Sequence, residues 1–236
     1  MPTPLQCHTE SVKIPRRSFL LAGSAALLAA AESRRLFDGS PRGWRAVGGP
    51  DFPRRSWTIE DGCLKALVAK PAFQDLRTVD EFSDFELDFE WKIAPGGNSG
   101  VKYLIYREDV WKPEGSEEFH ARGRGFEFQV ADDDAEPDAV AHPESRAGAL
   151  YGFLAPTQHV NKAVGEFNTA KIVRRGMRIE HWLNGERVVK AELDSPEIRD
   201  MMRTRRVPVA LPLRSPIVLQ NHSSEAWLRN LQIRDL

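Results

Sequence analysis

A strand-like stretch in the middle of the chain, residues 123–133, carries two polar side chains that could do chemistry. Its sequence, GRGFEFQVADD, alternates apolar residues such as Phe126 and Phe128 with Glu127 and Gln129. Successive side chains of a strand point to opposite faces, so Glu127 and Gln129 share one face, about 7 Å apart. A carboxyl group can exchange a proton, and an amide can donate and accept hydrogen bonds. We therefore predict that this strand face contributes to a polar site.

A second stretch, IVLQNH at residues 217–222, presents a similar pair. Gln220 and His222 fall on one face of the expected strand. Two such strands together could build a small site in which Glu127 and His222 transfer protons. Glu127 and His222 are therefore the candidate catalytic residues, and Gln129 and Gln220 are candidate substrate ligands.

The carboxyl groups in the sequence limit the kinds of reaction that such a site could perform. Glycosidases generally use two carboxylic acids, but the residue beside Glu127 is Gln129, which does not titrate. Asp132, Asp133 and Asp134 follow in a stretch that we interpret as a solvated loop. The acidic residues of ELDFEWKI favour a charged outer strand face, with Glu90 the best of them as a second carboxylate or sugar ligand.

The histidine spacing does not indicate a strong metal site. None of the six histidines belongs to an HxH or HExxH pattern. Glu127 and His222, with a glutamine, could still hold a divalent metal ion across strands, and the spacing leaves this alternative open. His181 alternates with Ile179 and Leu183, so we predict a position in the core.

Alternating hydrophobic residues predict that the chain after residue 35 consists mainly of β-strands. ELDFEWKI, residues 86–93, places its four apolar side chains on one face. Asn184-Gly185 is typical of a two-residue hairpin turn. Only residues 195–203 indicate a helix, with Ser195 as its N-cap. Many strands with little helix favour an antiparallel β-sandwich, and residues 35–236 contain neither a repeat nor a linker, which favours one domain.

The first 31 residues have a different composition from the rest. Arg16 and Arg17 precede an Ala-rich apolar run at residues 19–31. This run is shorter than the roughly 20 residues that a permanent membrane anchor needs. We predict that residues 1–31 are a cleavable export signal of the twin-arginine type, which would deliver the protein to the periplasm without a stable membrane anchor. Removal of Cys7 would leave Cys63 alone, without an intrachain disulfide.

Overall composition fits an ordinary soluble globular protein. Of the 236 residues, 41% are hydrophobic and 28% charged, and the formal net charge is −1. The short basic run RTRR at residues 203–206 is interpreted as a solvated edge. We therefore expect no nucleic-acid partner.

Nine short motifs follow one another in a recognisable order. They are LFDGSPRGW, WTIEDGCL, NSG, GFEFQ, GALYG, GEFN, HWLNG, IVLQNH and LRNLQI. In this order they resemble the 3-keto-disaccharide hydrolase domain family over nearly all of residues 35–236. Phe167 stands where tryptophan is usual in that family, and Ser223 where glycine is usual. The resemblance implies a concanavalin A-like jelly-roll sandwich with a carbohydrate site on its concave face.

The resemblance also suggests a substrate for which one carboxyl group is enough. A carbonyl at C3 of a sugar acidifies the hydrogen on C2, so a base can remove this proton and the glycosidic bond can break by elimination. The site then needs a base, donors for the enolate oxygen and a proton for the leaving group. Besides Gln129 and Gln220, we expect Asn98, Asn168 and Tyr151 to contact the sugar.

Three other functions are compatible with the sequence. They are a conventional glycosidase, a lectin-like carbohydrate-binding domain and a structural or partner-binding domain in the periplasm. A binding domain would favour exposed aromatic platforms, for which Trp111 and Tyr151 are the candidates. Trp91 and Trp227 are expected to face the core.

The export signal can be tested by itself. Residues 1–35 fused to a folded reporter should direct it to the periplasm, because the twin-arginine route carries folded proteins. Changing Arg16→Lys together with Arg17→Lys should hold the reporter in the cytoplasm, as measured by cell fractionation. Unchanged export of the double variant would contradict a twin-arginine signal.

Overall fold

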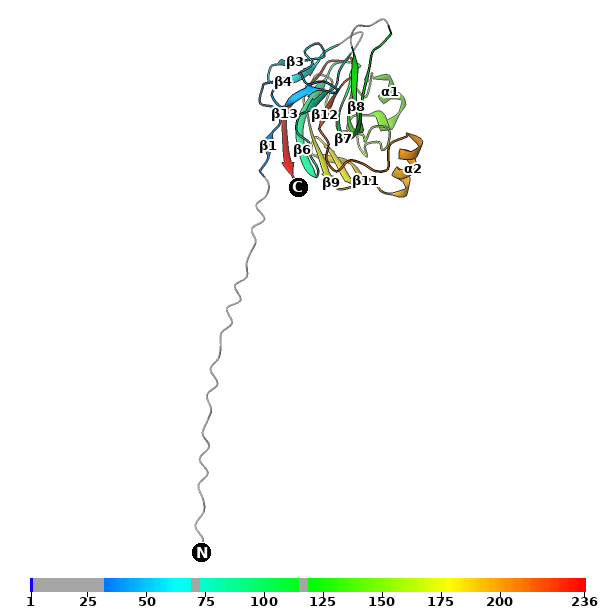
Figure 1. The fold of residues 1–236 in the computed structure, drawn as a ribbon. Helices are drawn as coiled ribbons and strands as arrows, with labels where there is room; N and C mark the ends of the chain where they lie inside the picture. The colour runs from blue at the N-terminus through cyan, green and yellow to red at the C-terminus, as the bar shows by residue number, and fades with distance from the viewer. Residues whose placement is uncertain (2–31, 69–72, 115–118) are drawn as a thin grey trace. The chain divides into compact units, whose positions relative to one another are not determined.

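The alternating apolar residues predicted from the sequence meet between two β-sheets. Figure 1 shows the strands of these sheets as arrows. The computed structural model describes Met1 and residues 32–68, 73–114 and 119–236. The predicted export signal, apart from Met1, lies outside these described residues. The described residues from Glu32 onward belong to one compact unit.

The larger sheet has eight strands and supplies one wall of the core. Along the sheet they are β11 (Glu186–Glu192), β10 (Arg178–Leu183), β9 (Asn168–Arg175), β6 (Phe85–Ile93), β13 (Ala226–Asp235), β4 (Cys63–Ala66) and β3 (Trp57–Glu60), with β1 (Arg34–Arg35) also paired to β13. β10 and β11 form the hairpin predicted from Asn184 and Gly185, whose φ angles are 48° and 90°.

The smaller sheet has five strands and carries the residues singled out for chemistry. Their order is β2 (Trp44–Ala46), β5 (Leu76–Thr78), β12 (Val218–Asn221), β7 (Asn98–Trp111) and β8 (His120–Ala131). The ladders between the named strands of both sheets are antiparallel, which confirms the predicted β-sandwich.

The predicted helix is present as α2 (Pro196–Thr204). The Ser195 hydroxyl accepts a hydrogen bond from the Ile198 N–H at 3.3 Å, which confirms the N-cap. A short helix α1 (Pro137–Ala141) and the 3₁₀ turn η1 (Pro143–Ser145) were not predicted. Neither α1 nor α2 is long and apolar enough to cross a membrane.

Aromatic side chains from the two sheets meet in the core. Alternate residues of β6 are buried throughout its length, as the ELDFEWKI pattern predicted. The Phe89 ring on β6 packs edge-on against Phe128 on β8, with centroids 5.4 Å apart. Phe126 and Phe128 therefore face inward, and Glu127 and Gln129 face out of the smaller sheet.

The prediction that Trp227 faces the core was wrong. Its neighbours Ala226 and Leu228 point inward, so the register of β13 places Trp227 on the outer face of the larger sheet. The Lys65 and Lys92 ammonium groups lie 4.9 and 4.6 Å from the centre of its ring. Cation–π contacts make this outer position favourable for a tryptophan.

His181 occupies the core position predicted for it. Its Nε2 atom lies 2.8 Å from the Tyr103 hydroxyl, and its Nδ1 lies 3.0 Å from the Gly148 carbonyl oxygen. Burial lowers the pKa of His181 to about 4, so the imidazole is neutral near pH 7. Nδ1–H then donates to Gly148, and Nε2 accepts from Tyr103.

Removal of the Tyr103 hydroxyl should destabilise the fold measurably. Tyr103→Phe leaves Nε2 of the buried His181 without its donor, which typically costs about 1–3 kcal/mol. We expect this loss in the free energy of urea unfolding at pH 7. Tyr106→Phe, on the same strand but half-buried, is the matched control and should lose less. Equal losses in the two variants would contradict the role of this hydrogen bond.

Candidate active site

Glu127 lies at the centre of a polar cluster on the outer face of the smaller sheet. On β8 it is directly paired with Lys102 of β7, and only 7% of its surface is exposed. In the amide orientation that satisfies both neighbours, Gln220 of β12 donates from Nε2 to Glu127 Oε1 (3.3 Å). The Oε1 atom of Gln220 then accepts from Lys102 Nζ (3.1 Å). Three adjacent strands thus each supply one side chain to this cluster.

Gly100 makes room for the carboxyl group. It is the glycine of the NSG motif, and it stands on β7 two residues before Lys102. A Cβ atom on Gly100 would collide with the Glu127 carboxyl group, whose carbon would lie only 2.7 Å away. A glycine in a strand costs stability, and here the close approach of Glu127 explains it.

Asp75, just before β5, holds the cluster together from the other side. Its carboxylate accepts a hydrogen bond from Lys102 Nζ at 3.1 Å, and both side chains are buried. It also accepts from the backbone N–H groups of Asn221 (3.0 Å) and Gly123 (3.2 Å). One buried carboxylate therefore joins the ends of β5 and β12 to β7 and β8.

The surroundings of Glu127 shift its proton affinity toward neutral pH. Burial raises the pKa of Glu127 to about 7. The Lys102 ammonium opposes this rise in pKa, and the Asp75 carboxylate adds to it. Both the protonated and the ionised form are therefore populated near pH 7, as a general acid or base requires.

His222 follows β12 directly and belongs to the same electrostatic environment. Its side chain is exposed, yet the surrounding protein still desolvates it in part. This desolvation, followed by the positive charges of Arg122 and Lys102, lowers the pKa of His222. Lys102, Arg122 and Asp75 also act on Glu127. The structure thus places both predicted catalytic residues around the same three charged groups.

Arg122 of β8 supplies a further positive charge. Its guanidinium lies 4.6 Å from the centre of the Phe73 ring, and this ring lies 6.3 Å from that of His222. Among the described residues, its buried Nε atom has no hydrogen-bond partner. Arg122 therefore adds a positive charge beside the Phe73 and His222 rings.

Three of the predicted substrate ligands lie on β8 or beside it. Gln129 belongs to β8, Asn98 begins the neighbouring β7, and Tyr151 lies in the segment after η1. Gln129, 1% exposed, donates from Nε2 to Asn98 Oδ1 at a long 3.5 Å. The Tyr151 N–H donates to the Glu127 carbonyl oxygen, and its hydroxyl donates to Asp138 at 2.9 Å. Burial and then this hydrogen bond raise the pKa of Tyr151 to about 12, so its hydroxyl stays protonated.

Two other predicted ligands, Asn168 and Glu90, do not join this cluster. Asn168 begins β9 of the larger sheet, where its Oδ1 accepts from the Lys162 N–H and from Asn184 Nδ2, both at 2.8 Å. Glu90 lies on β6 and pairs with Arg229 at 2.7 Å. Both belong to local networks of the opposite sheet.

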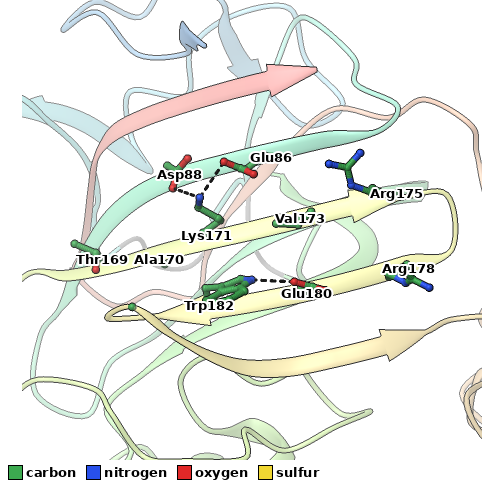
Figure 2. A pocket seen from close by; sticks show the side chains of 11 residues that line it. Glu86, Asp88, Thr169, Ala170, Lys171, Val173, Arg175, Arg178, Glu180 and Trp182 are labelled. Atoms are coloured by element: carbon green, nitrogen blue, oxygen red, sulfur yellow. Dashed lines mark hydrogen bonds and ion pairs between the residues drawn. The ribbon is translucent and has the colours of Figure 1, made fainter. Parts of the chain in front are cut away.

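The acidic stripe of β6 is a paired outer strand face, as predicted. It borders a groove of about 560 Å³ on the larger sheet, shown in Figure 2. Lys171 lies between the two carboxylates, 2.9 Å from Glu86 and 3.5 Å from Asp88. These carboxylates therefore neutralise a lysine on the sheet opposite to Glu127.

The interpretation of Asp132 as a solvated loop residue was wrong. Its side chain is buried and accepts hydrogen bonds from the N–H groups of Gly96 (2.7 Å) and Asp134 (3.2 Å).

Within the described ranges, no group of three or more His, Cys, Asp or Glu residues is arranged to hold a metal ion.

Sequence analysis missed Lys102, Asp75 and Arg122. The alternation in VKYLIY could have placed Lys102 opposite to Val101 and Tyr103, on the outer face. Its pairing with Glu127 requires the hairpin register, which shifts between Tyr103 and Arg107. Asp75 shows no periodic signal, because its role depends on three strands distant in sequence.

The architecture is that of a galectin-like β-sandwich bearing a buried acid–base cluster. A Bacillus subtilis protein described as having a galectin-like fold matches with a TM-score of 0.53 and 11% identity, over 88% of this chain and 96% of its own. A Parabacteroides distasonis structure described as a candidate glycosyl hydrolase gives a TM-score of 0.71 and 24% identity, over 86% of this chain and 94% of its own.

Sequence comparison places the chain more narrowly. The sequence model of the 3-keto-α-glucoside-1,2-lyase-like domain matches residues 32–234, and the chain belongs to this family. A protein of Bacteroides thetaiotaomicron named 3-keto-disaccharide hydrolase is 29% identical over 225 residues, which cover 85% of this chain and 77% of the relative.

The raised pKa of Glu127 predicts a pH-dependent stability difference. The folded protein binds this proton more tightly than the unfolded chain, whose ordinary value is 4.5. The stabilisation is therefore complete below about pH 4.5 and is lost as the pH rises through about 7. Glu127→Gln should gain up to about 3 kcal/mol over wild type between pH 4.5 and 8, measured by urea unfolding.

Glu90→Gln is the matched control for this measurement. Partial burial raises the pKa of Glu90, but hydrogen bonds from Asn230 and Arg229 lower it overall. Its stabilisation is present above the ordinary pKa of 4.5 and is lost only as the pH falls below it, so the stability difference between Glu90→Gln and wild type should stay nearly constant between pH 4.5 and 8. A pH-independent difference between wild type and Glu127→Gln would contradict the raised pKa.

Proposed function

We propose that this chain is an enzyme that cleaves glycosides whose sugar carries a keto group at C3. The observation that carries the proposal is the buried Glu127, hydrogen-bonded to Gln220 beside Lys102 and with a pKa of about 7, in a chain of this family. The name of the Bacteroides relative supports the same substrate class.

The reaction begins with removal of the proton on C2. The electron pair of the C2–H bond forms the C2–C3 double bond, and the negative charge collects on the C3 oxygen. This charge then returns to break the C1–O bond, and the departing oxygen takes up a proton. The products are an alcohol and an unsaturated 3-keto sugar. Addition of water across its double bond, with OH at C1 and H at C2, completes a net hydrolysis.

The two titrating residues divide the proton transfers. The lowered pKa of His222 keeps its imidazole neutral near pH 7, so His222 is the base that removes the C2 proton. Glu127 is partly protonated at this pH and donates the proton to the leaving oxygen. The cations Lys102 and Arg122 stabilise the enolate oxygen, and Gln129 with Asn98 binds sugar hydroxyl groups.

The leaving group provides the sharpest test of this assignment. A general acid typically contributes about 100- to 10,000-fold in rate. The rate of cleavage of methyl 3-keto-glucoside by Glu127→Gln should fall by this factor. The rate on the corresponding nitrophenyl 3-keto-glucoside should change little, because its leaving group needs no proton. Wild-type kcat/KM on the methyl glycoside should also fall above about pH 7, as Glu127 loses its proton.

Substrate labels and a distant variant complete this experiment. His222→Ala should slow both substrates, and deuterium at C2 should slow wild-type cleavage. Glu90→Gln, on the opposite sheet, should keep full activity. Equal cleavage of the parent glycoside with an ordinary C3 hydroxyl, and no isotope effect at C2, would refute the elimination mechanism.

Exposed aromatic residues favour a lectin-like domain as a second candidate function. Trp111 and Phe119 are 39% and 51% exposed, and the Trp111 ring stacks on His120 with centroids 4.9 Å apart. Exposed rings suit stacking against sugars. Binding of keto and parent glycosides, without turnover of either in the presence of added divalent metal ions, would support this function.

The predicted export signal extends the proposal to location. We propose that residues 1–31 direct the folded domain to the periplasm, where it would meet glycosides before they enter the cell. The reporter fusion described above tests this part independently of catalysis.

A further inference from the structure

Phe73, which precedes β5, packs against both Arg122 and His222 of the candidate active site. The Arg122 guanidinium lies 4.6 Å from the centre of the Phe73 ring. The His222 ring lies 6.3 Å from the same centre and is tilted by 36°. The reaction proposed above assigns tasks to Arg122 and His222 but none to Phe73. One partly buried ring therefore contacts two groups of the proposed reaction.

The Arg122 guanidinium lies against a ring and not against a carboxylate. Burial lowers the pKa of Arg122, and the charges of Asp75 and Glu127 oppose this effect. Among the described residues, however, no carboxylate forms a hydrogen bond or an ion pair with Arg122, and its buried Nε atom has no partner. The face of an aromatic ring attracts a cation without cancelling its charge. A carboxylate in the place of the Phe73 ring would hold the guanidinium but would also neutralise it.

The neighbours of Phe73 fix its ring in this position. The Phe73 carbonyl oxygen accepts a hydrogen bond from the Ala121 N–H at 3.1 Å. The Phe73 N–H donates to His120 Nδ1 at a long 3.4 Å, and the two rings meet edge-on with centroids 4.3 Å apart. The two residues before Arg122 on β8 thus hold Phe73, whose ring then contacts the Arg122 guanidinium.

We propose that Phe73 is a positioning residue, which holds the Arg122 guanidinium beside His222 as a positive charge bound by a ring instead of a carboxylate. This inference rests on the function proposed above. In that reaction negative charge collects on the C3 oxygen, and a cation that is already in place stabilises this charge without reorganisation. The same cation disfavours a second proton on His222 and so keeps the base neutral.

Variants at position 73 test the role of the ring. Phe73→Leu removes the aromatic face but keeps an apolar side chain, so kcat on methyl 3-keto-glucoside should fall about tenfold while KM changes little. Phe73→Tyr retains the ring and should keep kcat near that of wild type. Phe167→Leu is the matched control, because it removes the same kind of contact from Arg229 on the larger sheet, and it should keep the wild-type kcat.

Arg122→Met shows whether Phe73 acts through Arg122. This variant removes the cation, so kcat should fall about 100- to 1,000-fold, as for the loss of a donor to a developing oxyanion. Adding Phe73→Leu should then slow the enzyme little further, because the ring has no cation left to hold. Losses that multiply in the double variant would mean that Phe73 acts by itself and would overturn the proposal.

The titration of His222 tests the position of the cation without any turnover. Burial lowers the pKa of His222, and the charged groups that act on it are Arg122 and Lys102, which lower it further, and Glu136 and Asp75, which raise it. NMR of the ring C–H groups, assigned with His222→Ala, measures this pKa. It should rise toward the ordinary 6.5 in Arg122→Met and in Phe73→Leu, but not in Phe73→Tyr.

The two kinds of measurement separate this inference from the proposed function. If the wild-type protein leaves 3-keto glycosides intact, the proposed function is wrong, and the His222 titrations alone decide on Phe73. An unchanged pKa of His222 in Phe73→Leu would show that the ring does not hold the cation in place. A wild-type kcat in Phe73→Leu, on a substrate that is cleaved, would overturn the proposal equally.

Discussion

The buried ion pair between Asp75 and Lys102 is the interaction on which the candidate active site depends. Both side chains lie in the protein interior, where an isolated charge would be very unfavourable. The Asp75 carboxylate accepts hydrogen bonds from Lys102 and from two backbone N–H groups, which compensate its burial. Removal of either partner would leave a buried charge. This one electrostatic requirement therefore joins the ends of β5 and β12 to β7 and β8.

The same pair determines the behaviour of Glu127. Lys102 faces two carboxyl groups, but only Asp75 is within direct hydrogen-bond distance of its ammonium group, at 3.1 Å. The Gln220 amide bridges Glu127 and Lys102, since it donates to Glu127 and accepts from Lys102, and the Lys102 charge also lowers the pKa of Glu127 directly. The Lys102 charge offsets the effect of burial only in part, so the pKa of Glu127 is about 7. Asp75 and Glu127 therefore lie beside one cation but differ in their hydrogen-bond partners.

The sequence contained more of the fold than of the site. The strict alternation in ELDFEWKI predicted strand β6, Asn184-Gly185 predicted the hairpin of β10 and β11, and Ser195 predicted the start of α2. These predictions were possible because each pattern depends only on neighbours in the chain. Alternation also brought Glu127 and Gln129 to the correct face. The ion pair of Asp75 and Lys102 joins residues 27 positions apart in the chain, and the outward position of Trp227 depends on the register of β13. Such long-range pairings leave no local pattern.

Gly100 has a consequence for the history of this family. The position is empty of side chain because the long carboxyl side chain of residue 127 occupies its space. If a smaller residue replaces the acid at position 127, a cavity opens beside position 100, and a larger residue can then be accommodated there. The two positions should consequently co-vary, with glycine kept wherever the acid is kept. A bulky residue at position 100 would then accompany a residue other than glutamate at position 127 in a chain that keeps the same sandwich.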